Sequence, residues 1–419
     1  MLCVEQYIYL QIIIKKGMDS DMIIAADTLI SGDGHTIIRN GGILCENEKI
    51  IAVGEGIKLR EAYPQEEYVD YGPATILPGL IDMHVHIAYY LNRSDTSLYT
   101  DHLVAYQALY NAQLMLFNGV TTIRDVFCPS GVCRQLAYAA KKGFVRAPRI
   151  IHSNRALTNT GGIDWQSGGA TVQVDGPEEI RKAVRREIRE GAQWIKAMTS
   201  WRKPNVAQFD QEELNMIVNE THRLGYKTAA HATLQPALQM CIEAGFDTIE
   251  HGTDLTLEQA QIMKEKGIAY TPTIYVHKAI YEQLAEKLAM GGVLSEYEKQ
   301  TYSIYKKATA TYAQNFLPIY NSGVLTLAGT DCVFEGMENI SVAHELACMV
   351  EYGLKPVQAI ATAAKNAAQA LDLSGHIGEL CQGAIADVLV VSGDAGKDIT
   401  ALKQICDVYQ NGVRIQRAI

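Results

Sequence analysis

Hydrophobic and polar positions follow two different rhythms along the chain. Near the amino terminus, short apolar runs are separated by turn residues, at 23–30, 36–38, 43–45 and 49–53. The turns fall at Gly32-Asp-Gly34 and Gly41-Gly42, and runs bounded in this way predict a small antiparallel sheet. A matching pattern covers 386–391 and 407–415, where Asn411-Gly412 is a strong signal for a two-residue hairpin turn. Both ends of the chain are therefore expected to build one small β domain.

Between these ends the pattern changes to apolar strands separated by amphipathic helices. Eight strands are predicted, at 76–86, 120–126, 149–154, 194–198, 227–232, 248–252, 269–273 and 326–331. Pro177 stands in the first turn of a predicted helix, and Asp210 with Glu213 forms a capping-box pattern at the start of another. Eight strand-helix repeats predict the α/β class, as a (β/α)8 TIM barrel. The predicted domains are a composite β-sandwich, 22–75 plus 377–419, and a metal-dependent barrel, 76–376.

Two stretches interrupt the strand-helix repeats. Residues 157–170 are rich in glycine, and residues 277–316 form a long helical insertion with many tyrosines. Each stretch follows a predicted strand, on the face where TIM barrels carry their chemistry. We therefore expect both to act as substrate-binding lids. Ordinary amphipathic packing is the alternative explanation for the tyrosines.

Composition limits the classes of function. The 419 residues are 48% hydrophobic and 20% charged, which is the balance of a soluble globular protein rather than of a disordered or fibrous one. The expected partner is a small-molecule substrate. Lysine and arginine number 37 against 47 aspartates and glutamates, a net charge of −10 without a basic block, which argues against a nucleic-acid partner. No apolar run approaches the about 18 residues that a membrane span requires.

Cysteine usage and the amino-terminal segment bear on the compartment. The nine cysteines are scattered, odd in number and never spaced Cys-x-x-Cys, so neither a disulfide framework nor a zinc ribbon is predicted. The apolar run 7–14 is followed, not preceded, by Lys15 and Lys16, and it lacks a small-residue cleavage site, unlike a secretory signal. We expect a cytoplasmic protein with reduced thiols, and hypothesise that residues 1–17 reflect an over-long translation start.

The ends of the predicted strands carry the candidate chemistry. His84 and His86 end the first strand, and because side chains two apart on a strand point the same way, they can share one metal. Metal-binding residue types also occur at the ends of later strands, namely Lys196, His231, His251 and Asp331. The carboxyl ends of barrel strands converge on one rim. These six residues are therefore predicted to form one metal centre.

The chain resembles the amidohydrolase superfamily, in particular its binuclear-metal, imidazolonepropionase-like and prolidase-like members, which include Xaa-Pro and Xaa-Arg/Lys dipeptidases. The supporting motifs are Gly119-Val-Thr-Thr-Ile-Arg-Asp125, His251-Gly-Thr-Asp254 and Thr271-Pro-Thr273. The resemblance implies that His84, His86 and Asp331 bind one metal, and that His231 and His251 bind a second. It also implies that Lys196, carboxylated on Nζ, bridges both.

Physical chemistry supports the modified lysine and suggests a mechanism. A protonated lysine would be repelled by two divalent ions, whereas burial lowers its pKa and frees the amine to take up carbon dioxide. Two metals would generate a bridging hydroxide near neutral pH and polarise the scissile carbonyl. Asp331 would act as general base and then as general acid toward the leaving nitrogen. Zinc is the default metal for histidine-rich sites, and manganese or cobalt remain alternatives.

The substrate is less constrained than the chemistry. This chain has Thr233 where the resembling group often carries a tyrosine two after the fifth-strand histidine, and it lacks that group's His-Gly-Asp sequence in the third loop. Another group must then stabilise the oxyanion, and the candidates are Trp165, Tyr275 and His277. A substrate carboxylate could be anchored by residues near the rim, namely Arg155, Arg202 and Lys203.

Three functions are compatible with these residues. The first is a metal-dependent hydrolase of an amide C–N bond in dipeptides or N-acyl amino acids. The second applies the same chemistry to a cyclic amide, urea or carbamate. The third is a non-catalytic scaffold of the same fold, which the complete set of six ligand positions argues against. A homo-oligomer is compatible with all three.

Overall fold

The computed structural model describes residues 21–88, 100–129, 131–165, 169–200, 205–332 and 341–416. The chain divides into two compact units. Unit 1 comprises Met1–Leu80, Phe117–Thr121 and Lys355–Ile419, and unit 2 comprises Ile81–Leu116 and Thr122–Leu354. All six residues of the predicted metal centre belong to unit 2, so each unit is described by itself.

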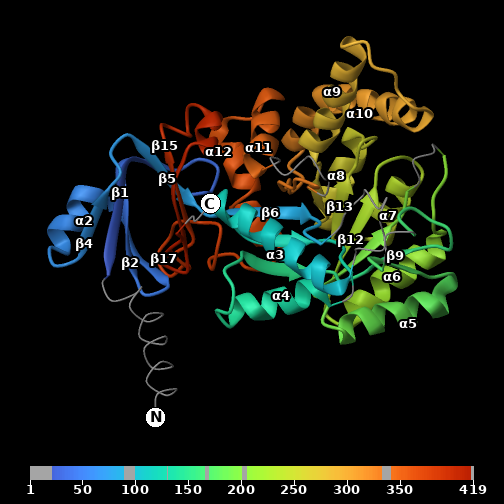
Figure 1. Ribbon diagram of the computed structural model, residues 1–419, viewed down its shortest axis with the longest axis horizontal. Coiled ribbons are helices and arrows are strands. Elements are labelled where there is room, and N and C mark those ends of the chain that lie inside the picture. Colours follow the sequence, from blue (N-terminus) through green and yellow to red (C-terminus); the bar gives the residue numbers. More distant parts are fainter. Residues whose placement is uncertain are drawn as a thin grey trace. The chain divides into compact units, whose positions relative to one another are not determined.

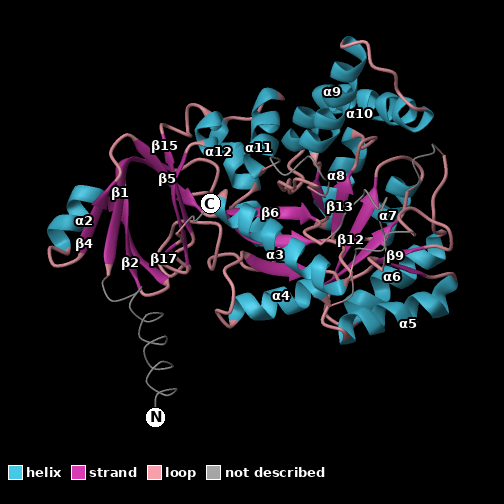
Figure 2. Ribbon diagram, in the orientation of Figure 1, coloured by secondary structure: helices cyan, strands magenta, loops and turns pink. Residues whose placement is uncertain are grey.

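Unit 1 is built around one sheet that combines strands from both ends of the chain (Figure 2). Its strands are β1 (Met22–Ile30), β2 (Ile37–Glu46), β3 (Lys49–Glu55), β4 (Glu67–Asp70), β5 (Ala74–Pro78), β15 (Val388–Ser392), β16 (Ile405–Gln410) and β17 (Val413–Arg414). Their order is β17-β16-β15-β5-β1-β2-β3, with β4 also on β1. The antiparallel pair β15 and β5 joins the two chain ends. This hydrogen bonding gives a single sheet and does not confirm the separate layers of a sandwich.

Two glycine-containing pairs in unit 1, Asn411-Gly412 and Gly41-Gly42, act in different ways. Asn411 and Gly412 have positive φ of 51° and 77° and form the two-residue turn between β16 and β17, as predicted. Gly41-Gly42, expected as a turn, instead lies inside the continuous strand β2. A Cβ on Gly41 would come within 2.5 Å of the Leu29 side chain on β1. These glycines therefore permit close approach of two paired strands.

The predicted first barrel strand, 76–86, is in fact two strands. β5 ends at Pro78, and β6 (Leu80–Val85) begins after Gly79. A Cβ at Gly79 would lie 2.3 Å from the hydroxyl oxygen of Thr121, and the Gly79 amide donates to the Asp387 carbonyl. The apolar run is continuous in sequence because both strands are buried, and only the glycine marks the break.

Unit 2 alternates parallel strands with helices. After β6, its strands are β7 (Val120–Asp125), β8 (Arg149–His152), β9 (Ala156–Thr158), β10 (Thr171–Gln173), β11 (Trp194–Met198), β12 (Lys227–Ala232), β13 (Thr248–His251) and β14 (Ala269–Thr271). They pair as β6-β7-β8 and as β10-β9-β11-β12-β13-β14. This α/β architecture is consistent with a TIM barrel.

The helices of unit 2 lie around these strands (Figure 1). They are α3 (Asp101–Phe117), α4 (Val132–Lys141), α5 (Gly176–Arg189), α6 (Gln211–Arg223), α7 (Ala237–Ala244), α8 (Leu257–Lys266), α9 (Ile274–Ala289), α10 (Glu296–Asn321) and α11 (Val342–Glu351). The predicted capping box of α6 is confirmed, because Asp210 accepts from the Glu213 amide and Glu213 accepts from the Asp210 amide. In the described part of the chain, no helix is long and apolar enough to cross a bilayer.

The predicted eighth strand, 326–331, is not a regular strand. Thr326 forms an isolated bridge with Tyr270 of β14, and the Leu327 amide donates to the Tyr270 carbonyl at 2.8 Å. On the other side, the Met83 amide of β6 donates to the Ala328 carbonyl at 2.9 Å. The extended segment is thus hydrogen-bonded to both β14 and β6, but it has too few consecutive paired residues to count as a β-strand. It ends at Asp331.

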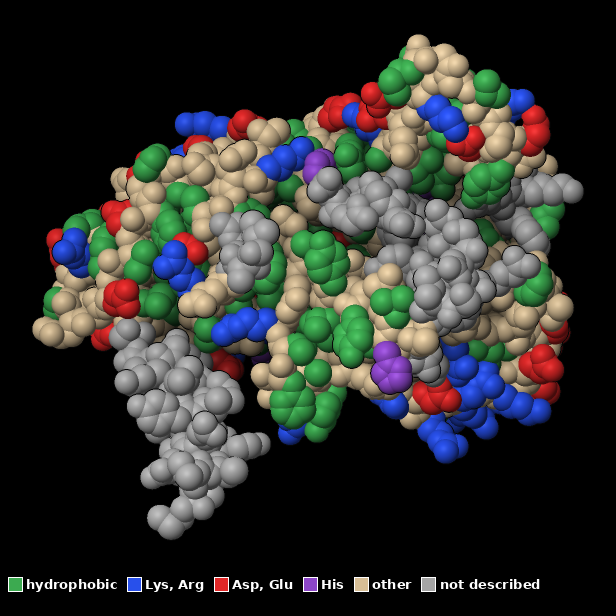
Figure 3. Space-filling model, viewed as in Figure 1, with side chains coloured by type: hydrophobic (Ala, Val, Ile, Leu, Met, Phe, Trp, Pro, Cys, Tyr) green, Lys and Arg blue, Asp and Glu red, His purple; other side chains and the backbone are tan. Residues whose placement is uncertain are grey.

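Figure 3 shows basic side chains gathered over α5. Three of them pair with glutamates: Arg181 with Glu178, Arg185 with Glu220, and Arg186 with Glu187. Negative charge is therefore interleaved with this basic surface.

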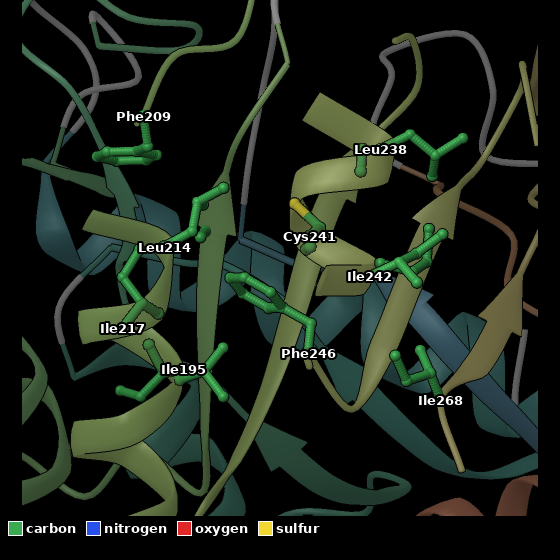
Figure 4. Packing of buried hydrophobic residues seen from close by; sticks show 14 of the residues in the cluster. Ile195, Phe209, Leu214, Ile217, Leu238, Cys241, Ile242, Phe246 and Ile268 are labelled. Atoms are coloured by element: carbon green, nitrogen blue, oxygen red, sulfur yellow. The ribbon is translucent and has the colours of Figure 1, made fainter. Parts of the chain in front are cut away.

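A large buried cluster packs the helices of unit 2 onto β11, β12 and β13. Figure 4 shows Phe246 among Ile217, Cys241, Ile242 and Ile195 in this cluster. Phe246 is fully buried. Burial of such side chains stabilises the strands whose ends carry the candidate site.

We predict that Phe246→Ala lowers the free energy of unfolding by about 3–5 kcal/mol, because the cavity left in a packed core adds to the lost burial. Denaturant unfolding of the full chain measures this change. Phe144→Ala is the matched control, since Phe144 is 75% exposed, and we expect a change within about 0.5 kcal/mol. Equal effects of the two substitutions would contradict the assignment of this core.

Candidate active site

The structure brings five of the six predicted site residues together, namely four histidine rings and the Asp331 carboxylate. His84 lies on β6 and His86 just after it, His231 lies on β12 and His251 ends β13. The His84 ring centroid is 5.1 Å from that of His86 and 4.9 Å from that of His251, and His231 is 4.6 Å from His251. Ligand atoms of His84, His251 and Asp331 all lie within 4.8 Å of one another. A His/Asp group that could hold a metal ion is therefore present.

The outer ring nitrogens of His84 and His86 are already used for hydrogen bonds. His84 Nδ1 lies 2.7 Å from a Glu250 carboxylate oxygen, and His86 Nδ1 lies 3.4 Å from the Phe127 carbonyl oxygen. Both partners can only accept, so each neutral ring carries its proton on Nδ1 and a lone pair on Nε2. These Nε2 atoms face Asp331 Oδ1 at 3.4 and 3.1 Å. Lone pairs thus face a carboxylate at distances that favour a proton or a cation between them.

Lys196 of β11 lies at the floor of the site. Its side chain is fully buried, and its Nζ has no hydrogen-bond partner among the described residues. Burial lowers the pKa of Lys196 to about 8, although the carboxylates of Glu250 and Asp331 oppose this shift. A buried amine with this pKa is partly uncharged near neutral pH, and its lone pair is available for chemistry or metal binding.

The pKa values of Asp331, His84 and His251 all lie below their usual ranges. Burial would raise the pKa of Asp331, but the neighbouring His84, His86 and His251 lower it well below its usual range. Burial also lowers the pKa values of His84 and His251. An ionised carboxylate among neutral imidazoles is a donor set suited to a divalent ion. Asp331 and His251 have positive φ of 50° and 70°, a conformation that is uncommon outside glycine and that concentrates at functional sites.

A buried ion pair supports the site, and our reading of the sequence did not anticipate it. Glu250 accepts from His84 through one oxygen, and through the other from Thr248 and from Arg124 Nη2 at 2.7 Å. Arg124 also donates to the Met83 carbonyl at 2.6 Å, and its guanidinium lies over the Trp194 ring. Charged residues inside two buried strands, β7 and β13, are the signal that could have indicated this pair.

Asp82 fixes the backbone on both sides of the site. Its carboxylate accepts from the His84 amide at 3.1 Å, from the Thr330 amide at 3.0 Å and from the Thr330 hydroxyl at 2.7 Å. These bonds tie the end of β6 to the residue before Asp331. The mutual placement of His84 and Asp331 therefore depends on a third, buried carboxylate.

A cavity of about 270 Å³ opens above these residues. All six residues of the predicted metal centre line the cavity and form its floor, namely His84, His86, Lys196, His231, His251 and Asp331. Both insertions predicted as lids contribute to its walls, through Ile163 and Asp164 in one and through the amino-terminal half of α10 in the other. Apolar side chains from the strand ends complete the lining, among them Phe127, Met198 and Leu234.

The three residues proposed to contact substrate are placed differently. His277 on α9 lines the cavity, and its ring lies 5.9 Å from that of His251. Tyr275 does not line the cavity and instead stacks on His344 at 4.7 Å. Trp165 is 49% exposed and also lies outside the lining, next to Asp164. The expected substrate roles of Tyr275 and Trp165 are therefore not supported.

Of the three proposed carboxylate anchors, Arg155 does not fill that role in this structure. Arg155 is paired with Glu187 at 2.7 Å and with Glu190 at 3.0 Å, and it does not line the cavity. Arg202 and Lys203 lie outside the described residues. Sequence reasoning missed Asp254 and Lys307, which do line the cavity.

Comparison with known proteins identifies the family. The amidohydrolase family model matches residues 75–414. The chain is 28% identical to ochratoxinase of Aspergillus niger over 433 aligned positions, which cover 93% of this chain and 85% of the relative. It is similar to the structure of a Xaa-Pro dipeptidase with bound methionine, with a TM-score of 0.84 and 28% identity over 95% of this chain and 100% of that one. A prolidase complexed with N-methylphosphonate-L-proline matches with a TM-score of 0.82 and 25% identity over the same shares.

The chain belongs to the amidohydrolase family. The resemblance to its prolidase-like members, predicted from the strand-end residues and motifs, is confirmed. The protein is accordingly a hydrolase that acts on C–N bonds.

We predict that Arg124→Met lowers the free energy of unfolding by about 3–5 kcal/mol, because it leaves the buried Glu250 carboxylate without its cation. Adding Glu250→Gln to this variant should recover part of the loss by removing the unpaired charge. The control is Arg185→Met, which breaks an ion pair of a half-exposed arginine and should cost at most about 1 kcal/mol. Equal destabilisation in Arg124→Met and Arg185→Met, measured by denaturant unfolding, would refute the role of the buried pair.

Proposed function

We propose that the protein is a two-metal hydrolase that cleaves the amide C–N bond of dipeptides or N-acyl amino acids. The observation that carries this proposal is the close approach of two imidazole nitrogens to a carboxylate oxygen at the cavity floor. The Nε2 atoms of His84 and His86 lie 3.4 and 3.1 Å from Asp331 Oδ1. A cation between these atoms removes their repulsion. A second, independent observation supports the proposal, because the buried Nζ of Lys196 has no hydrogen-bond partner in the part of the chain that the structure describes.

The proposal includes a closed (β/α)8 barrel as the scaffold. Seven of its strands would be β6, β7, β8, β11, β12, β13 and β14, and residues 325–328 would be the eighth. Hydrogen bonds from Met83 to Ala328 and between Tyr270 and residues 325 and 327 support closure on one side. The bond from the Gln193 amide to the His152 carbonyl supports it between β8 and β11. A closed ring gives all strand ends one common rim.

The donor set fits two divalent ions. One would be held by His84, His86 and Asp331, and the other by His231 and His251, with Lys196 between them. The neutral amine of Lys196 would attack the carbon of carbon dioxide and release one proton to water, which gives a carbamate whose single negative charge is shared by two oxygens. In this form Lys196 would help to hold the ions. Zinc is the default metal for these nitrogen donors, and manganese or cobalt suits the added oxygen ligands.

The chain's own residues then have distinct tasks. Bound divalent ions would supply Lewis acidity that activates water and polarises the amide carbonyl. Asp331 would accept the proton of the attacking water and deliver it to the leaving nitrogen. Glu250 keeps the His84 lone pair directed at the centre, and burial lowers the pKa of His84, which favours metal binding over protonation of this ring. The cavity walls would exclude bulk water from the reacting amide.

The names of the relatives and the shape of the cavity support this substrate class. The similar solved structures carry the names Xaa-Pro dipeptidase and prolidase, and the Aspergillus niger relative carries the name ochratoxinase. The apolar side chains at the cavity walls favour a substrate with an apolar group beside the amide. We further propose a cytoplasmic location and a homo-oligomer.

Metal content tests the two-metal centre directly. Protein purified with zinc supplied should contain close to two equivalents by elemental analysis, and a chelator should abolish hydrolysis reversibly. Lys196→Met should lower the content to one equivalent or less, because the bridging anion is lost. Lys227→Met is the control, since Lys227 begins β12 at the end away from His231, and its metal content should be unchanged. Less than one equivalent in the native protein would favour a non-catalytic scaffold.

A hydrolysis screen tests the substrate class. The zinc-loaded protein is incubated with a library of dipeptides and N-acyl amino acids, and release of the free amine is measured. We expect turnover of substrates with a free terminal carboxylate and loss of turnover when that carboxylate is blocked. Indifference to blocking would instead favour a cyclic amide, urea or carbamate as the substrate.

A further inference from the structure

Helix α10 presents one face to the cavity. Its lining residues are spaced three and four apart, as expected for one side of a helix, namely Tyr297, Gln300, Thr301, Ile304, Tyr305 and Ala308. Lys307 lies at the edge of this face and also lines the cavity. The cavity wall contributed by α10 is therefore mostly apolar and aromatic, with one cation beside it.

The position of α10 relative to the cavity floor is fixed by a buried tyrosine. Tyr312 donates to the carbonyl of His251 or of Pro272, both 2.9 Å from its hydroxyl. The rings of Tyr305 and Tyr312 also lie 5.1 and 5.4 Å from that of His277. Lys307 precedes Tyr312 by five residues, which is roughly 7.5 Å along a helix axis. Lys307 thus belongs to a helix that is attached to the end of β13 through Tyr312.

Lys307 is positioned to receive an anion. Among the described residues that line the cavity, the basic side chains are Lys196, buried at the floor, and Lys307, which is 69% exposed. The Lys307 ammonium lies 3.6 Å from Asp254, whose backbone is fixed by a bond from its amide to the Thr233 carbonyl. An ammonium has three donors, so Asp254 can orient Lys307 while other donors remain for a ligand.

We infer that Lys307 anchors the free carboxylate of the substrate. The α10 face would select substrates in which the amino acid that carries this carboxylate has an apolar or aromatic side chain. This inference rests on the proposed function and deepens it. Without a cation at the mouth, a substrate carboxylate would be drawn to the divalent ions proposed for the floor of the site. The Lys307 ammonium would instead bind the substrate carboxylate at the mouth of the cavity. The amide of the substrate would then face Asp331. Ile304 and Tyr305 on the same face then contact the neighbouring side chain.

Matched ligands and matched variants test this role. Binding of N-acetyl-L-phenylalanine and of its carboxamide is measured by calorimetry on the zinc-loaded native protein, Lys307→Met, Lys307→Arg and Lys306→Met. Lys306 is the neighbouring lysine on α10, outside the cavity lining and over the Tyr302 ring. The same four proteins are assayed with an N-acyl phenylalanine and its carboxamide in hydrolysis, with kcat and KM determined separately.

We expect Lys307→Met to weaken binding of the acid about tenfold and to leave binding of the carboxamide unchanged. Lys306→Met should match the native protein, and Lys307→Arg should retain the preference for the acid. In hydrolysis, Lys307→Met should raise KM for the acid with little change in kcat. Equal effects on acid and carboxamide, or equal behaviour of the Lys306 and Lys307 variants, would overturn the inference. Absence of hydrolysis with Lys307-dependent acid binding would count against the proposed function and leave the anchor supported.

Discussion

The burial of the Glu250 carboxylate is the constraint on which the site depends. An isolated carboxylate in the core would be strongly unfavourable, and the guanidinium of Arg124, itself fully buried, makes it tolerable. The same carboxylate accepts from His84 and so fixes which ring nitrogen faces the centre. Arg124 extends the effect by binding the Met83 carbonyl on β6 and lying over Trp194 on β11. One ion pair therefore couples the packing of several strands to the orientation of a candidate metal ligand.

Charge is distributed differently at the floor and at the mouth of the cavity. At the floor, burial favours neutral forms of His84, His251 and Lys196, and the ionised Asp331 stands among them. At the mouth, Lys307 and Asp254 keep contact with water, and their 3.6 Å ion pair is weak because solvent screens it. The floor is thus preorganised and costly to change, whereas the mouth can exchange its internal ion pair for a ligand at little cost.

The sequence predicted the parts of the site that depend on regular geometry, and failed where the backbone is irregular. His84 and His86 were found because strand side chains alternate, and convergence of strand ends accounts for the placement of His231 and His251. Tyr275 and His277 were both expected near substrate, but two residues apart on a helix point in nearly opposite directions. Because α9 begins at Ile274, directly after Thr273 with its positive φ, only His277 faces the cavity. The break at Gly79 depends on contact with Thr121, which no local pattern contains.

The threonine at position 233 changes how the carbonyl of a substrate can be polarised. Its hydroxyl lies 2.9 Å from that of Ser200, and its amide donates to the Ser200 oxygen, so the residue ties β12 to the end of β11. His277 is the candidate oxyanion donor that does reach the cavity. Its Nδ1 donates to the Thr273 carbonyl, and burial lowers the pKa of its ring, so the neutral ring presents a lone pair on Nε2. A lone pair cannot stabilise an oxyanion. None of the three residues expected to stabilise the oxyanion is therefore placed to do so, and we expect the proposed metal ions to polarise the carbonyl in their stead.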